Sequence, residues 1–155
     1  MEKSITPFAG QSSFAKEIGT LVKTLSGNKA SVLLIGEGGT GKRLIAQHIH
    51  FLSAGNSSCF FEINCRSFTE AQILGAFETV SRLIAYNQII TLFVCFADRL
   101  SETMQKAFLE LIKTTEAKGL KLRIISSVEK PLEDSVKTGG FLPDLYGRQI
   151  GRAHV

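Results

Sequence analysis

Gly36-Glu37-Gly38-Gly39-Thr40-Gly41-Lys42 is a glycine-rich segment that satisfies the pattern G-x-x-x-x-G-K. It follows Ser31–Ile35, a short aliphatic run that predicts a buried strand, and it precedes an amphipathic helix that we expect to reach His50. Glycines allow backbone N–H groups to turn inward towards an anion. The helix that follows adds its own N–H donors, and Lys42 adds a cation. The segment therefore predicts a phosphate-binding loop.

Arg43 departs from the general pattern, which has Ser or Thr at this position to hold Mg²⁺ through a hydroxyl group. The sequence therefore leaves the need for Mg²⁺ open. A plain glycine turn with an incidental lysine is the alternative interpretation. The strand and helix on either side favour a true phosphate loop for ATP or ADP. We expect its residues to be Gly36, Glu37, Gly38, Gly39, Thr40, Gly41, Lys42 and Arg43.

Strands and helices alternate outward from this loop. Apolar runs predict strands at residues 59–63, 89–96 and 122–127. Helical spacing predicts helices at residues 14–25, 69–86 and 101–118, with Ser101 as an N-cap and Gly119 as a stop. This alternation predicts an α/β fold, a three-layer sandwich around a mostly parallel sheet of about five strands. We expect residues 1–155 to form one such domain.

The bulk composition limits the class of protein. The chain is 44% hydrophobic and 21% charged, as in an ordinary globular domain. The net charge of +4 is too small to indicate nucleic-acid binding by itself. A local basic cluster is formed by Lys113, Lys118, Lys121 and Arg123. We interpret it as a solvated surface, with a DNA contact as the alternative. The sequence has no apolar stretch of membrane-spanning length and no signal peptide at its N-terminus, so we expect a cytoplasmic protein.

The cysteines and histidines predict no metal site. Cys59, Cys65 and Cys95 have no paired ligand spacing, and we expect them to be buried small hydrophobic residues. His48 and His50 are two residues apart on a helix and so point to different faces.

Several segments, in order along nearly the whole chain, resemble the AAA+ sigma-54-dependent transcription activators (bacterial enhancer-binding proteins). The segments that carry the resemblance are Gly36–Ala46 (GETGTGKELIA in the family), Phe61–Cys65, Thr91–Val94 (TLFL), Leu122–Ile125, and Phe141 with Asp144–Tyr146 (FREDLYYRL). The family also lacks Ser or Thr after the lysine. The resemblance implies a transcription regulator of response-regulator type with an ATP-binding P-loop, and it places Ala9 and Gly10 beside the adenine. Self-oligomers are a possible partner, and DNA would be bound only through a domain outside this chain.

The departures from the family pattern concern hydrolysis. Cys95 and Phe96 stand where the family has an aspartate that holds magnesium and a glutamate that polarises water. Asp98 is near, but we expect it beyond the strand. Glu129 takes the place of the sensor asparagine, and Leu142 replaces the first of two arginines. Arg148 therefore remains as the candidate trans arginine finger, and no residue is assigned a catalytic role.

Contact with sigma-54 RNA polymerase is doubtful, because the family's GAFTGA loop is not intact. Gly75-Ala76-Phe77 matches only its first half, as a remnant or an accident, and we favour the accident. The helical lid is absent before Val155. We expect an excised domain with a lid and a helix-turn-helix beyond, and a truncated relative is the alternative.

Three hypotheses follow. The leading one is a regulator domain that binds ATP or ADP and hydrolyses it poorly or not at all, and it requires that carboxylates do not converge on the phosphate loop. An active ATPase that remodels sigma-54 polymerase is the second, and it needs another carboxylate to replace the lost pair. The third is an interaction or oligomerisation module that uses the fold only as a scaffold.

Overall fold

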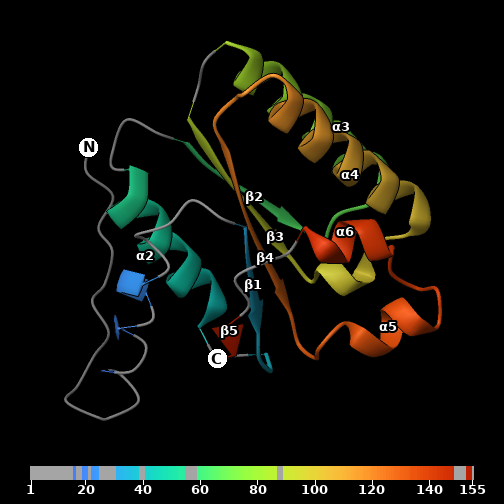
Figure 1. Cartoon of the computed structure of the whole chain (residues 1–155), viewed down its shortest axis with the longest axis horizontal. Helices are drawn as coiled ribbons and strands as arrows, with labels where there is room; N and C mark the ends of the chain where they lie inside the picture. Colours follow the sequence, from blue (N-terminus) through green and yellow to red (C-terminus); the bar gives the residue numbers. More distant parts are fainter. Residues whose placement is uncertain are drawn as a thin grey trace.

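The computed structural model describes residues 31–38, 41–54, 59–86, 89–148 and 153–154, together with positions 16, 19–20 and 22–24. The elements in chain order are β1 (Val32–Ile35), α2 (Lys42–Ala54), β2 (Cys59–Asn64), α3 (Glu70–Ala85), β3 (Ile90–Cys95), the 3-10 turn η1 (Ala97–Arg99), α4 (Glu102–Ala117), β4 (Leu122–Val128), α5 (Glu133–Lys137), α6 (Pro143–Gly147) and β5 (Ala153–His154). Figure 1 labels all of these elements except η1. Within the helix predicted at residues 14–25, the described positions 16, 19–20 and 22–24 are helical, and the other positions lie outside the described residues.

The strands form one five-stranded sheet in the order β2-β3-β4-β1-β5. Each neighbouring pair is parallel, which confirms the predicted sheet. Ile35 pairs with Val128, and Cys95 pairs with Ser127, so β1, β3 and β4 end at the same edge. The segments that follow these three strands therefore meet there, which is where open parallel sheets bind their ligands.

Helices cover both faces of the sheet, α2 on one face and α3 with α4 on the other (Figure 1). The alternation along β3 shows how the sequence encodes this. Phe93 and Cys95 pack in the cluster that holds Ile45 and Ile49 of α2, whereas Leu92 and Val94 belong to the larger cluster beneath α3 and α4. A strand that is buried on both sides reads as a continuous apolar run. The three-layer α/β fold is confirmed.

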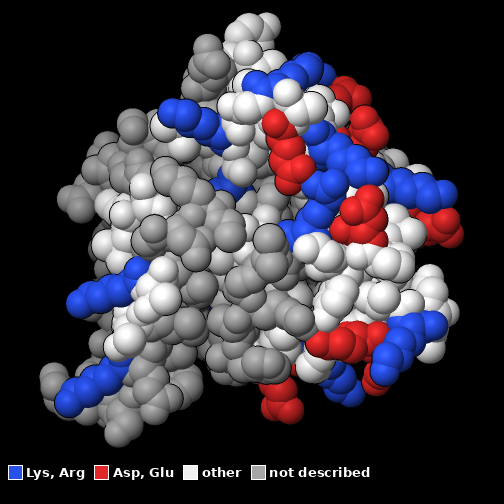
Figure 2. Space-filling model, in the orientation of Figure 1, with Lys and Arg blue, Asp and Glu red and all other residues white. Residues whose placement is uncertain are grey.

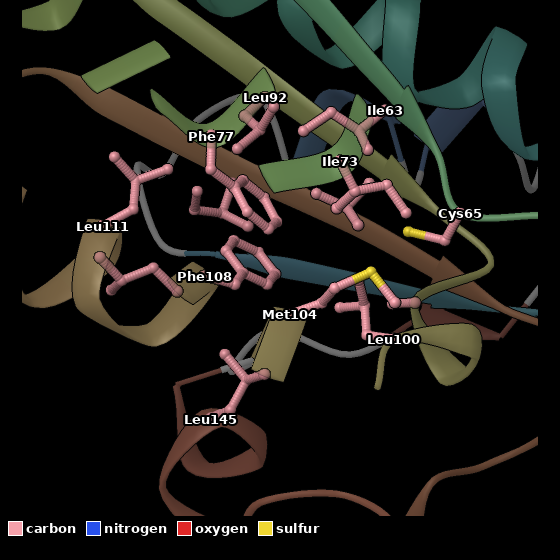
Figure 3. Close-up of a cluster of buried hydrophobic side chains, with 14 of the residues drawn as sticks. Ile63, Cys65, Ile73, Phe77, Leu92, Leu100, Met104, Phe108, Leu111 and Leu145 are labelled. Carbon is pink, nitrogen blue, oxygen red and sulfur yellow. The ribbon is translucent and has the colours of Figure 1, made fainter. Parts of the chain in front are cut away.

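The larger cluster lies between the sheet, α3, α4 and α6 (Figure 3). Phe77 of α3 and Phe108 of α4 stack with their ring centroids 5.1 Å apart, and Leu145 of α6 closes the cluster from below. Phe77 is 4% exposed. Gly75-Ala76-Phe77 therefore lies within a packed helix, and Phe77 serves the core.

Capping residues fix the ends of the long helices. Thr69 accepts a hydrogen bond from the backbone N–H of Gln72, whose side chain accepts from the Thr69 N–H in return. Ser101 accepts from the N–H of Met104, as its predicted N-cap role requires. Gly119 has a φ of +65°, which a glycine adopts without strain, just after α4 ends.

Helix α2 continues one turn beyond the predicted end at His50. The buried stripe that made the helix visible in the sequence does stop there, because Leu52 in the last turn is 61% exposed. Ser53 supports this final turn by donating to the carbonyl of Ile49 at 2.6 Å. The helical backbone therefore extends to Ala54, beyond the point where the apolar pattern of the sequence ends.

Two predictions about burial are wrong in part. Cys59 is exposed because it is the first residue of β2, at the sheet edge, whereas Cys65 and Cys95 are buried as predicted. Arg123 is 8% exposed and donates to the Ser53 hydroxyl at 3.0 Å, so it is not part of a solvated basic surface. On the side where Figure 1 draws α4, α5 and α6, basic and acidic side chains intermingle (Figure 2).

No helix among the described residues combines the length and the apolar character that a membrane crossing requires.

Candidate functional site

The glycine-rich segment connects β1 to α2 at the edge where the strands end. The N–H of Gly36 donates to the carbonyl of Val128 at 3.1 Å, which ties the start of the loop to β4. Gly41 has a φ of +81°, a conformation that disfavours residues with a side chain, and its carbonyl accepts the N–H of Ile45 at 3.0 Å to begin the helix. Gly39 and Thr40 lie outside the described residues, as do Ala9 and Gly10.

Lys42 directs its ammonium group back across the loop. Its Nζ donates to the carbonyls of Gly36 and Glu37, the second at 2.8 Å. Burial lowers the pKa of Lys42, and the negative charge of Glu129 opposes that shift. In the described part of the loop, two backbone carbonyls thus face the Lys42 ammonium group, which lies at the N-terminal end of α2, the end of a helix that favours anions.

Glu129 is the first residue after β4, and its carboxylate lies against the loop. A Cβ atom placed on Gly38 would be 2.9 Å from Glu129 Oε2, so only a glycine allows this approach without a shift of one of the two. Glu129, which the sequence predicts to take the place of the sensor asparagine, thus presents negative charge to the loop.

The end of β3 provides no catalytic base. Burial, with the neighbouring Glu62 carboxylate, raises the pKa of Cys95 to about 12, so the thiol stays protonated at neutral pH. Phe96 follows in the left-handed conformation with φ 57°, which is uncommon for a bulky residue, and the guanidinium of Arg66 lies 5.0 Å from its ring centroid. Neither side chain can accept a proton from water at neutral pH.

Asp98 lies beyond the strand, as expected from the sequence. It belongs to the turn η1, and its carboxylate is 4.0 Å from the Arg99 Nε atom.

A carboxylate that the sequence did not point to stands beside the two altered positions. Oε2 of Glu62 on β2 accepts from Arg43 Nη2 at 2.5 Å and from Arg43 Nε at 3.1 Å. The same oxygen accepts from the Cys95 thiol at 3.5 Å. The sequence offered one sign of this contact, because Glu62 is the single acidic residue in the apolar run 59–63. In the structure that run is β2, which pairs with β3.

Two carboxylates, Glu129 and Glu62, therefore approach the glycine-rich loop, so the expectation that no carboxylates meet there is wrong. Glu129 comes from the sensor strand, and Glu62 comes from the edge strand, where it forms an ion pair with Arg43. Neither carboxylate occupies one of the two strand-end positions where the family has acids and this chain has Cys95 and Phe96. Their presence gives the active-ATPase hypothesis a specific residue to test.

Arg148, the candidate trans finger, is held within the chain. It caps α6 and forms ion pairs with Glu116 of α4 and with Asp144, whose other partner is Lys113 at 3.2 Å. Its hydrogen bond to Glu116 raises the pKa of Arg148, and the hydrogen bond from Lys113, together with the one from Arg148, lowers the pKa of Asp144. A role in a neighbouring subunit would require these ion pairs to be exchanged.

The family model described as the Sigma-54 interaction domain matches residues 8–151. The chain belongs to this family. A signal-transduction and transcriptional-control protein of Clostridium beijerinckii is 30% identical over 160 residues, which cover 90% of this chain and 25% of that protein. The sigma54-dependent transcriptional activator SfnR of Pseudomonas putida is 28% identical over 141 residues, 78% of this chain and 38% of that protein.

Solved structures support the fold of this sigma-54 interaction domain. NtrX from Brucella abortus in complex with ADP superposes with a TM-score of 0.78 at 22% identity, over 94% of this chain and 37% of that one. The P-loop NTPase domain of a sigma-54 activator from E. coli gives 0.61 at 19% identity, over 83% of this chain and 98% of that one. The chain spans between a quarter and two fifths of the length of these two curated relatives.

Proposed function

We propose that this sigma-54 interaction domain is a regulatory module that binds ATP or ADP and hydrolyses ATP poorly or not at all. The observation that carries the proposal is the end of β3, where the protonated thiol of Cys95 and the ring of Phe96 stand in place of two acids. Hydrolysis needs a group that orients or deprotonates water, and general-base catalysis is worth about 10²–10⁴-fold in rate.

Three features support nucleotide binding. The loop begins on a strand, ends on a helix and keeps Lys42 directed across it. Gly41 retains the backbone conformation that the turn requires. The NtrX structures from Brucella abortus, which share this fold, were determined in complex with ADP and with ATP.

The module's partners belong to the same proposal. Its relatives are longer regulators, so we propose that the chain works as one module of such a protein, with DNA bound by another part and with self-association as a possible output. Direct contact with sigma-54 is the least supported part of the proposal, because Gly75-Ala76-Phe77 lies within helix α3 and does not form a loop.

Calorimetric titration of the full chain with ATP and ADP tests the binding. We expect both nucleotides to bind and Lys42→Ala to abolish the heat of binding. Lys106→Ala is the matched control, because Lys106 is an exposed lysine paired with Glu102 on α4. Phosphate release from ATP should stay near the background rate. Absence of binding at millimolar nucleotide, or a Lys42→Ala variant that binds normally, would favour the interaction module instead.

An active ATPase is the second candidate, and the position of the Glu62 carboxylate favours it. Its carboxylate lies 3.5 Å from the Cys95 sulfur, next to the position of the lost acid. This candidate expects turnover that is well above background and is lost in Glu62→Gln. Asp98→Ala serves as the comparison, because Asp98 lies beyond the strand. Turnover abolished by Asp98→Ala alone would point to that residue instead.

A further inference from the structure

The residues at the altered positions do not fit a magnesium site. In the general P-loop pattern the ion is held by the residue after the lysine and by the acid of the β3 strand. These positions are Arg43 and Cys95, a guanidinium and a protonated thiol, whereas Mg²⁺ takes oxygen ligands. The nearby carboxylate oxygen, Glu62 Oε2, already accepts hydrogen bonds from both.

A cation is nevertheless present at this place, since the guanidinium of Arg43 is part of the protein. Its Nε and Nη2 atoms bind Glu62 Oε2, and this contact orients the planar group beside the first turn of α2. The Arg43 side chain keeps 59% of its surface exposed, and a guanidinium has five N–H donors, so donors remain for a second anion. Arginine recognises phosphate oxygens through paired N–H groups.

We propose that the loop binds a nucleoside phosphate without a divalent cation, with the Arg43 guanidinium supplying the positive charge that a magnesium ion provides in other P-loops. This inference rests on the proposed nucleotide binding and specifies which groups balance the charge of the phosphates. Lys42 and the helix N-terminus hold the phosphates, and Arg43 balances their outer charge. Glu62 positions Arg43 and does not touch the ligand.

Calorimetric titration of the full chain with ADP, once in EDTA and once in millimolar Mg²⁺, tests the inference. We expect the two dissociation constants to agree within about threefold. In EDTA, Arg43→Ala should weaken ADP binding about tenfold, the loss expected for one charge-assisted hydrogen bond. Arg82→Ala is the matched control, because Arg82 forms a comparable exposed ion pair with Glu78 at 2.9 Å on α3. Circular dichroism reports whether each variant is folded.

The outcomes separate this inference from the function on which it rests. Tight binding in Mg²⁺ that falls tenfold or more in EDTA overturns the inference and leaves nucleotide binding intact. No binding in either buffer overturns both. Equal binding in the two buffers with no loss in Arg43→Ala also overturns the role of Arg43.

Glu62→Gln provides a second variant should Arg43→Ala fail to fold. It keeps the shape of the side chain and an oxygen that can accept from Arg43, and it removes only the negative charge. If Arg43 is the cation, ADP binding in EDTA persists or tightens. If Glu62 is a metal ligand, the variant loses affinity only in Mg²⁺, and that result contradicts the inference.

Discussion

The carboxylate of Glu129 lies so close to Gly38 that a Cβ on the glycine would be 2.9 Å from Oε2. Gly38 belongs to the loop, and Glu129 follows the strand that pairs with β1, so the contact joins the two segments that flank the proposed phosphate position. A negative charge at this place disfavours further negative charge in the loop. The contact therefore bears on which nucleotide the proposed site prefers.

Glu129→Gln is expected to raise the affinity for ATP more than the affinity for ADP, because ATP carries the additional phosphate. Two unit charges about 4 Å apart interact by about 1 kcal/mol in water and more in a less polar site, so we expect roughly a fivefold to tenfold gain. Parallel titrations of the two nucleotides measure it. Glu102→Gln, on the exposed face of α4, is the control. An equal gain for both nucleotides would contradict the assigned position of Glu129.

The buried thiols should make the protein less stable at alkaline pH. Burial raises the pKa of Cys65 and of Cys95 from 9.0 to about 12. The unfolded chain therefore releases these protons near pH 9, while the folded chain holds them, and stability falls as the pH rises from about 9 to about 12. The slope is about 1.4 kcal/mol per pH unit for each thiol.

Urea unfolding at pH 7, 9, 10 and 11 measures this slope. Cys65→Ala should flatten the alkaline part of the curve, relative to its own stability at pH 7. Cys59→Ala is the control, because Cys59 is exposed on the edge strand. The assignment fails if the Cys65→Ala curve runs parallel to that of the unmodified protein.

Alkylation should distinguish the same three cysteines by rate. The thiolate is the reactive form, and it is scarce at pH 8 for a thiol whose pKa is about 12. We expect iodoacetamide to modify Cys59 first, and Cys65 and Cys95 on the order of a hundredfold more slowly or only on unfolding. Peptide mass spectrometry over time gives the rates. Early modification of Cys95 would show that the end of β3 is open to solvent.

The elements near the loop were predictable because local chemistry determines them. The turn needs the positive φ of Gly41, Ser101 caps an N–H only three residues away, and the mostly apolar run from Ile90 to Cys95 is buried throughout. Each of these signals lies within a few residues of its effect. The parallel sheet followed from the alternation of strands and helices.

The Glu62 contacts could not be predicted in the same way. They join residues 19 and 33 positions apart, and they depend on β2 pairing with β3 in one register, with Glu62 opposite Phe93. A sequence reveals an acidic residue in an apolar strand but not the neighbour that it meets. Arg123 escaped prediction for the same reason, because its partner Ser53 lies on another element.

Gln105 holds the segment before α6 against α4, and its replacement should release that segment. The side chain is 2% exposed, and its Nε2 atom donates to the carbonyls of Leu100 and Gly140, each at 2.9 Å. Its Oε1 atom accepts the N–H of Leu142 at 2.8 Å. Gln105→Leu fills a similar volume but leaves these three backbone groups without this partner. We expect a loss of about 2–4 kcal/mol of unfolding free energy in urea.

Hydrogen exchange then separates a local effect from a global one. In Gln105→Leu the Leu142 amide should exchange much faster, while amides of β3 change only as far as the global stability falls. Gln105→Glu keeps an acceptor for Leu142 and loses the two donated bonds, so that amide should remain protected in the variant. If Leu142 exchanges equally fast in both variants, the Oε1 bond does not hold the segment, and packing of Leu145 in the core must do so instead.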